Sequence, residues 1–174
     1  MEFFSNVLQI YSERWPWFME LLGEQLRISL LSILISGSIG LLLGIFIAVH
    51  RRFAEPIIGV CNVFYTIPAI ALLGLLIPLV GIGEKNAIIA IVLYGLMPMV
   101  RNTYTGITNI SSDLIDAAVG MGSTKRQLLL RIKLPLATSV IIAGLRNLVV
   151  ISIATGSIAA FIGGGGLGGA IFPR

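Results

Sequence analysis

Long runs of apolar residues alternate with short polar stretches along this chain of 174 residues. The apolar runs cover residues 28–49, 57–80, 87–110 and 136–162. Each run is long enough, as a helix, to cross the roughly 30 Å hydrocarbon core of a bilayer. Residues 1–27 are mixed, with Trp15 and Trp17 among charged residues, which favours a partly helical lead-in at the membrane interface. The pattern predicts an all-α membrane protein that forms one transmembrane domain.

The first apolar run carries a small residue at every fourth position. These residues are Ser32, Ser36, Gly40, Gly44 and Ala48. Residues with this spacing share one helix face, and small side chains there let a second helix approach closely. We therefore expect this face to lie against another helix.

The second run contains polar residues followed by a proline. Asn62, Tyr65 and Thr66 lie on adjacent turns, and Pro68 follows near the middle of the run. A proline there removes a backbone hydrogen bond and clashes with the carbonyl of Phe64. Interrupted helices at mid-depth often line a transport path. The alternative is a kink that is buried against other helices, and the sequence leaves both interpretations open.

Two arginines fall within the later runs. Arg101 either extends toward the cytoplasmic interface or faces a water-filled path. Arg146, next to Asn147, lies about 16 Å along a helix from Pro135. It serves as a pore or gate charge, or it holds helices together through backbone carbonyls. None of the four runs contains a carboxylate to pair with it, which favours the structural role.

The longest polar stretch covers residues 113–135 and predicts two short helices. Asp113 is suited to cap the first helix, and Ser123 or Thr124 the second. Thr124 has Gln127 three residues later, the spacing of a capping box. This stretch is therefore expected to lie in water between the third and fourth runs.

Two residues set the limits of these short helices. Gly122 stands between them, where a left-handed backbone is least costly for glycine. Pro135 is expected to end the second helix, because proline does not continue a helix and restricts the residue before it. The whole spacing resembles the EAA motif of ABC-importer permease subunits. The residues that carry this resemblance are Asp116, Ala117, Ala118, Gly122, Ile132, Leu134 and Pro135.

The resemblance implies a role and a set of partners. In that family the motif is a cytoplasmic coupling element that docks onto the ATP-hydrolysing subunit, and Asp116 replaces the usual glutamate. The family has a five-helix core, which works with a second permease subunit, an ABC ATPase dimer and an external substrate-binding protein. ATP would be bound by the partner ATPase, so no enzyme activity and no cofactor are expected in this chain. The family's last helix is expected to be missing after Arg174.

Further segments resemble the osmoprotectant branch, whose permeases import glycine betaine, carnitine or choline. They are residues 65–68, 100–107, 143–146 and 161–168. Most of them also fit importers of methionine or other amino acids, which is the alternative. A membrane-integral enzyme would need a charged catalytic cluster at membrane depth. A scaffold that transports nothing would not need the spacing from Gly122 to Pro135.

The basic residues indicate how the chain is oriented in the membrane. The net charge of +4 accompanies 56% hydrophobic residues, and the basic residues lie between apolar runs, which indicates membrane topology and not nucleic-acid binding. Seven lie on the side of the polar stretch: Arg51, Arg52, Arg101, Lys125, Arg126, Arg131 and Lys133. Four lie on the other side: Arg14, Arg27, Lys85 and Arg174. The positive-inside rule therefore predicts a cytoplasmic coupling segment and an external N-terminus in the plasma (inner) membrane of a prokaryote.

Other chemistry has little support in the sequence. One cysteine, Cys61, and one histidine, His50, form no metal-ligand cluster, so no metal site is expected. The glycine-rich residues 163–169 lack the lysine and hydroxyl residue of a phosphate loop. They are expected to form a tight turn or re-entrant backbone on the outer side. The N-terminus lacks the pattern of a cleavable signal peptide.

Overall fold

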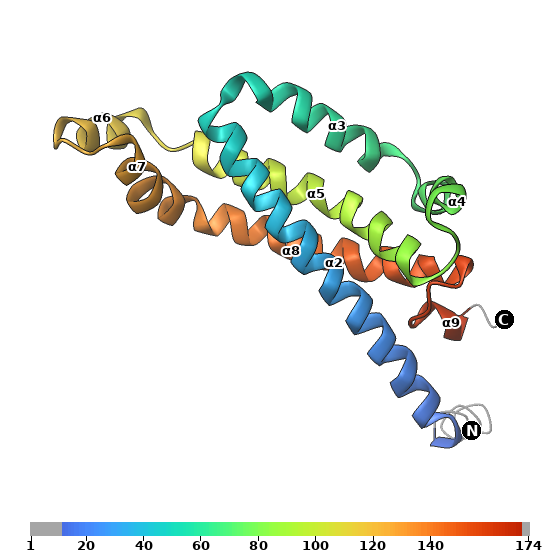
Figure 1. The fold of residues 1–174 in the computed structure, drawn as a ribbon. Helices are drawn as coiled ribbons and strands as arrows, with labels where there is room; N and C mark the ends of the chain where they lie inside the picture. Colours follow the sequence, from blue (N-terminus) through green and yellow to red (C-terminus); the bar gives the residue numbers. More distant parts are fainter. Residues whose placement is uncertain (1–11, 172–174) are drawn as a thin grey trace, which may run out of the picture.

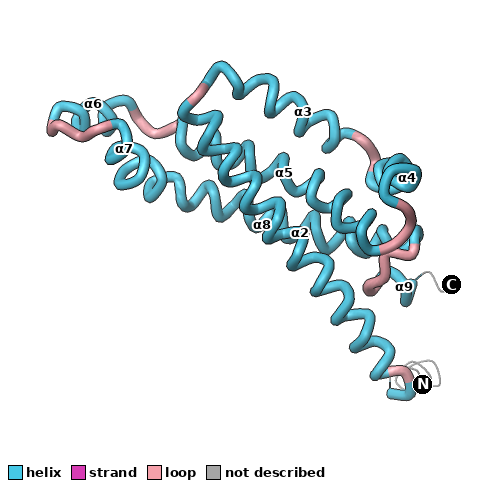
Figure 2. Tube along the Cα trace, viewed as in Figure 1, coloured by secondary structure: helices cyan, strands magenta, loops and turns pink. Residues whose placement is uncertain are grey.

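The computed structural model describes residues 12–171, and these form helices and turns with no strand among them (Figure 2). The elements are α2 (Trp15–Val49), η1 (Arg51–Phe53), α3 (Ala54–Thr66), α4 (Ala69–Val80), α5 (Glu84–Thr108), α6 (Ser112–Gly120), α7 (Lys125–Gln127), the π-helical η2 (Leu128–Lys133), α8 (Leu134–Ile158), η3 (Ala159–Ile162) and α9 (Gly168–Ile171). Within the described residues, three helices are long and apolar enough to cross a membrane, or up to four if the bent pair α3–α4 is one span. The predicted all-α membrane fold is confirmed.

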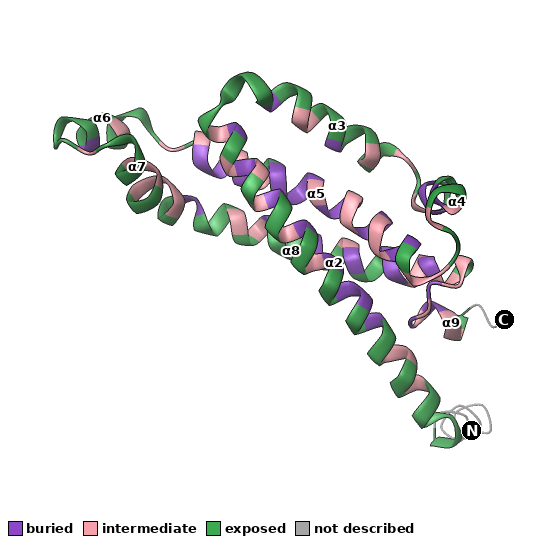
Figure 3. Cartoon of the chain, in the orientation of Figure 1, coloured by how far each residue is buried: buried purple, intermediate pink, exposed green. Residues whose placement is uncertain are grey.

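Helix α5 lies at the centre of the fold. It packs against α2 and α8, and also against α3 and α4, so four other helices contact it (Figure 1). Its residues Ile91, Val100 and Ile107 are buried, and in Figure 3 it is the helix with the most continuous buried surface. The apolar faces of α2 and α8 remain widely exposed in the single chain, as expected for surfaces that meet lipid or other subunits.

The face of small residues on α2 lies against α5, as predicted. Ser32, Ser36, Gly40 and Gly44 are buried, and Ala48 is half-buried. A Cβ atom added to Gly40 would lie 2.5 Å from the Cβ of Met99, and one added to Gly44 would lie 2.5 Å from the Cβ of Thr103. The hydroxyls of Ser32 and Ser36 donate to backbone carbonyls of their own helix at 2.8 and 2.6 Å, so these polar groups are satisfied in the interface.

The second apolar run forms two helices that meet at a sharp angle. Helices α3 and α4 are bent by 101° at the break between them. Ile67 and Pro68 are extended, with ψ of 129° and 138°. Because proline restricts the residue before it, Ile67 leaves the helical conformation and α4 starts anew at Ala69. The interruption that the sequence indicated at Pro68 is therefore present, and α3 and α4 together are long and apolar enough to form one broken span.

The second coupling helix does not end at Leu134–Pro135. Helical structure runs without interruption from Lys125 to Ile162. Residues 128–133 form a π-helical turn, in which the N–H of Leu134 donates to the carbonyl of Leu129, five residues earlier. This wider turn makes room for the ring of Pro135, which would clash with a carbonyl in a regular α-helix. The coupling segment is therefore rigidly continuous with α8.

Two other predicted boundaries shift. Helix α2 begins at Trp15, so much of the lead-in 1–27 is continuous with the first span, while residues 1–11 of it lie outside the described part. The third span, predicted at 87–110, runs as α5 from Glu84 to Thr108. The longer α2 matters because it places Glu20 and Glu24 on the same helix as the packing face.

Candidate coupling segment and transport path

The end of α6 is closed by backbone hydrogen bonds around a left-handed glycine. Gly122 has φ of 84°, as the sequence predicted for this position. The N–H of Ser123 donates to the carbonyl of Ala118 at 3.0 Å, and the N–H of Gly122 donates to that of Val119 at 2.9 Å. These two bonds form a Schellman motif, which satisfies carbonyls at the end of a helix. The turn between α6 and α7 is therefore defined by its own backbone.

The following helix starts with the predicted capping box. The N–H of Gln127 donates to the hydroxyl oxygen of Thr124 at 3.3 Å, and the N–H of Thr124 donates to Oε1 of Gln127 at 2.9 Å. Thr124 is therefore the cap of the second helix, in preference to Ser123. The expectation for Asp113 is wrong, because the N-cap position of α6 is Ser111. Asp113 lies in the first turn, where its charge favours the positive end of the helix dipole.

Two of the seven motif residues line a small cleft in the coupling segment. The cleft of about 270 Å³ lies between Gly122 and Ile132, and its lining also includes Met121, Gln127 and Arg131. The other five motif residues are not part of its lining: Asp116, Ala117 and Pro135 are exposed, Leu134 is half-buried, and Ala118 is buried. The structure thus brings Gly122 and Ile132 together and leaves one side of α6 open.

Sequence reasoning missed three exposed apolar side chains on α6 and the residue that follows it. Leu114 is 51% exposed, Val119 54% and Met121 81%. They lie on or next to the most hydrophilic part of the chain, so lipid does not account for their exposure. The sequence feature that could have revealed them is the presence of large apolar residues within a short polar stretch.

The candidate path residues are exposed in the single chain and come from four places in the fold. Asn62, Tyr65 and Thr66 lie on α3, Pro68 lies at the break, Arg101 lies on α5, and Arg146 and Asn147 lie on α8. Of these, Tyr65 makes an edge contact with the ring of Tyr94, with centroids 6.1 Å apart. Within residues 12–171, neither arginine takes part in an ion pair. Their roles stay predictions.

Two side chains of α5, missed in the sequence, hold the broken segment. The hydroxyl of Tyr94 donates to the carbonyl of Ile67. The side-chain amide of Asn86 donates to the carbonyls of Leu73 at 3.2 Å and Gly81 at 2.8 Å. Each of these side chains lies on the central helix, so α5 contacts both ends of α4. In the sequence, Asn86 and Tyr94 are isolated polar residues in or next to an apolar run, which is only weak evidence that they bind backbone carbonyls of another helix.

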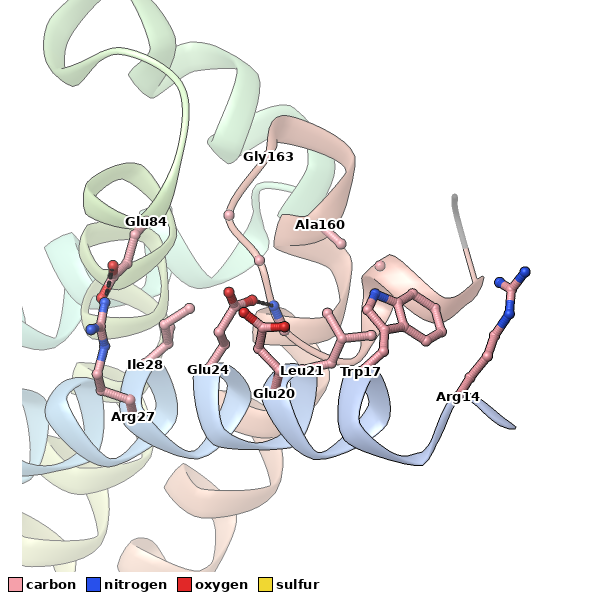
Figure 4. Close-up of a pocket in the computed structure, with 14 residues that line it drawn as sticks. Arg14, Trp17, Glu20, Leu21, Glu24, Arg27, Ile28, Glu84, Ala160 and Gly163 are labelled. Carbon is pink, nitrogen blue, oxygen red and sulfur yellow. Dashed lines mark hydrogen bonds and ion pairs between the residues drawn. The ribbon is translucent and has the colours of Figure 1, made fainter. Parts of the chain in front are cut away.

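The glycine-rich residues form a turn, which was one of the two predicted forms, and this turn lies against α2 (Figure 4). Glu24 accepts a hydrogen bond from the N–H of Gly166 at 2.9 Å, and Gly166 has φ of 81°. Beside this turn lies a cleft of about 600 Å³, whose lining includes Trp17 and Glu20. Arg27 on the same helix pairs with Glu84 at the start of α5. These contacts join the start of α2 to both α5 and the end of α8.

No group of three or more potential metal ligands occurs among the described residues. The described residues form long apolar helices, a broken helix pair with exposed polar side chains, and a polar helical segment before α8. This combination defines a multi-pass membrane protein.

Comparisons with known proteins specify the family. The chain belongs to the family of binding-protein-dependent transport system inner membrane components, whose model matches residues 40–173. It is similar to the carnitine transport permease protein OpuCD of Listeria monocytogenes, with 37% identity over 97% of this chain and 75% of that protein. It is also similar to the glycine betaine/carnitine/choline permease protein OpuCD of Bacillus subtilis, with 39% identity over 97% of this chain and 73% of that protein.

A solved structure supports the fold. The MetNI methionine ABC transporter, in inward-facing conformations, matches with a TM-score of 0.79 over 90% of this chain and 80% of that chain. The sequence identity of 24% means that this likeness concerns the fold alone. The chain therefore has the fold of a type I ABC importer permease. Such permeases work with an ATPase and a substrate-binding protein.

Proposed function

We propose that this chain is the permease subunit of an ATP-driven importer of osmoprotectants, such as glycine betaine, carnitine or choline. The observation that carries the proposal is the 37% to 39% identity, over nearly the whole chain, to permeases of these compounds. Glycine betaine, carnitine and choline share a trimethylammonium group, which is a compact cation with an apolar surface. The proposed cargo class is therefore defined by this group.

The broken helix pair supports a path for such a cation. Cationic trimethylammonium groups bind well against aromatic rings. Tyr65 is 44% exposed, and it lies beside Thr66 and the break at Pro68. Interrupted helices place backbone carbonyls and side chains at the transport path. We infer that Asn62, Tyr65, Thr66 and the residues of the break line half of this path.

Arg101, Arg146 and Asn147 complete the proposed path. Both arginines are exposed in the single chain and have no ion-pair partner within residues 12–171. An unpaired arginine at membrane depth needs water or backbone carbonyls around it. In a path between two permease subunits, the arginines would be surrounded by water. In a structural role at the subunit contact, they would bind backbone carbonyls.

The coupling segment is proposed to receive the movement of the ATPase. The exposed apolar residues Leu114, Val119 and Met121 are suited to a protein contact in water. The Schellman turn, the capping box and the continuous helix from Lys125 onward make the segment stiff. A stiff segment transmits a rigid-body displacement directly to α8.

The arrangement of the complete transporter follows from the same proposal. Two permease subunits, alike or different, would associate with an ATPase dimer that binds the ATP and with an external binding protein. The excess of basic residues supports a cytoplasmic coupling segment and an external N-terminus in the inner membrane.

Uptake measurements test the cargo. The chain would be expressed with its ATPase and binding protein in cells that lack other osmoprotectant importers. We expect ATP-dependent uptake of radiolabelled betaine, carnitine or choline, and none of methionine. Uptake of methionine alone would refute the proposed cargo, and would favour an amino-acid importer. No uptake of any compound by an assembled complex would favour a scaffold.

Substitution of Gly122 tests the coupling. Gly122→Pro removes the N–H that donates to Val119 and excludes the positive φ, so the turn cannot form as it is. We expect loss of uptake and of stimulated ATP hydrolysis, with unchanged affinity of the external binding protein. Gly120→Ala is the matched control, because an added Cβ at Gly120 meets nothing within 4 Å. Normal uptake by Gly122→Pro would contradict the coupling role.

A further inference from the structure

The carbonyl of Ile67 has lost its helical partner. In a continuous helix it would accept a hydrogen bond from Ala71, but the N–H groups of Ala71 and Leu72 both donate to the carbonyl of Pro68, at 2.9 and 3.0 Å. A backbone carbonyl without a partner is costly inside a membrane. The hydroxyl of Tyr94 supplies the missing hydrogen bond.

Tyr94 lies where it contacts both sides of the break. It is 7% exposed and belongs to the same buried cluster as Leu72 and Leu73 of α4. Its ring and the ring of Tyr65 on α3 make a T-shaped contact, with an interplanar angle of 65°. Tyr94 comes ten residues after the start of α5 at Glu84, which is about 15 Å along the helix. This is about half of the roughly 30 Å hydrocarbon core, so the break would lie near mid-depth with Glu84 at the membrane surface.

We propose that Tyr94 is a positioning residue for transport. Its hydroxyl fixes the direction of the chain at Ile67, and its ring fixes Tyr65, so the two contacts together set the angle at which α3 presents its polar residues. The role of Tyr94 in transport rests on the proposed function, whereas its contacts with Ile67 and Tyr65 do not.

Asn86, the second residue of α5 that binds α4, allows the positioning role of Tyr94 to be distinguished from simple anchoring of α4. Asn86 holds the middle and the C-terminal end of α4, at Leu73 and Gly81, and forms no hydrogen bond with a candidate path residue within residues 12–171. Loss of its hydrogen bonds would loosen α4 and leave the hydrogen bond at the break intact. Tyr94 both donates to Ile67 at the break and contacts the ring of Tyr65.

The main test compares two substitutions on α5 in the complete transporter. Tyr94→Phe removes only the hydroxyl that donates to Ile67. Tyr104→Phe is the matched control, because it deletes the same atom on the same helix and its hydroxyl makes no hydrogen bond among the described residues. For Tyr94→Phe we expect the maximal uptake rate to fall about three- to tenfold, the equivalent of ~0.7–1.4 kcal/mol at 1.4 kcal/mol per tenfold.

The other kinetic readouts distinguish positioning from damage. The KM of uptake is expected to stay unchanged, because the external binding protein captures the cargo. ATP hydrolysis stimulated by that protein is expected to continue, so more ATP is consumed per molecule imported. An unchanged uptake rate in Tyr94→Phe, or an equal loss in Tyr104→Phe, would overturn the proposal.

A thiol-labelling experiment tests the position without any cargo. Cys61 is the only cysteine, so Cys61→Ala with Thr66→Cys places one thiol beside the break. We expect Tyr94→Phe to change the labelling rate in membranes about threefold or more, since an average hydrogen bond in a membrane protein contributes ~0.6 kcal/mol. An unchanged rate would overturn the proposal, even if uptake falls.

The amount of chain in the membrane is compared first. We expect equal amounts for the parent, Tyr94→Phe and Tyr104→Phe. A loss of chain only with Tyr94→Phe would overturn the proposal, because the hydroxyl would then maintain the fold and not the path. If the parent itself imports no osmoprotectant, the proposed function fails, but the labelling result still decides whether Tyr94 positions the break.

Discussion

The contact between α2 and α5 at Gly44 is close enough to make a single methyl group costly. An added Cβ would lie 2.5 Å from the Cβ of Thr103, 2.8 Å from its Cγ2 and 3.0 Å from the carbonyl oxygen of Val100. Two of these atoms belong to or adjoin the backbone, so they do not move away by a change of rotamer. Gly44→Ala therefore requires the two helices to separate.

The size of the effect follows from two opposing terms. Overpacking in a close contact costs about 1–3 kcal/mol. Replacing glycine by alanine within a helix contributes about 1 kcal/mol in the other direction. We expect Gly44→Ala to lower the free energy of unfolding by about 0–2 kcal/mol, the overpacking cost less the gain in helix propensity.

Gly59→Ala is the matched control on α3. An added Cβ at Gly59 meets nothing within 4 Å, so only the gain in helix propensity remains. Unfolding by SDS in mixed micelles would be followed by circular dichroism for both variants and the parent. We expect a lower midpoint for Gly44→Ala and an equal or higher one for Gly59→Ala. A midpoint for Gly44→Ala at or above that of Gly59→Ala would refute the packing argument.

Three further predictions concern polar contacts. Asn86→Ala removes the hydrogen bonds to Leu73 and Gly81 and is expected to cost about 1–2 kcal/mol of unfolding free energy in the same SDS assay. Thr124→Ala removes the capping box and is expected to cost about 1 kcal/mol and to reduce stimulated ATP hydrolysis, which an unchanged hydrolysis rate would contradict. Glu84→Gln breaks the exposed ion pair with Arg27 that joins α2 and α5. The loss of unfolding free energy is expected to stay below about 1 kcal/mol and to vanish at high salt, and SDS titrations at two salt concentrations would measure it.

Features that depend on residues close together in the chain were predictable from the sequence. The capping box at Thr124 depends only on Gln127, three residues later. The left-handed backbone at Gly122 depends only on the end of the helix before it. The small face of α2 was also predictable, because its spacing of four is a property of one helix. The osmoprotectant branch was indicated by short motifs and is supported by relatives of the whole chain.

The consequences of the two prolines were not predictable in the same way. Each proline removes a backbone donor, and the sequence shows that loss without showing what compensates for it. At Pro135 the helix widens to a π turn and continues, so the compensation comes from its own backbone. At Pro68 the helix breaks, and the hydroxyl of Tyr94 from another helix donates to the carbonyl of Ile67, which the break leaves without a helical partner. The outcome therefore depends on whether a neighbouring helix offers a hydrogen-bond donor at that depth. For this reason the helix continues through Pro135, where an end was predicted, whereas residues 57–80 form two helices with a bend of 101° at Pro68.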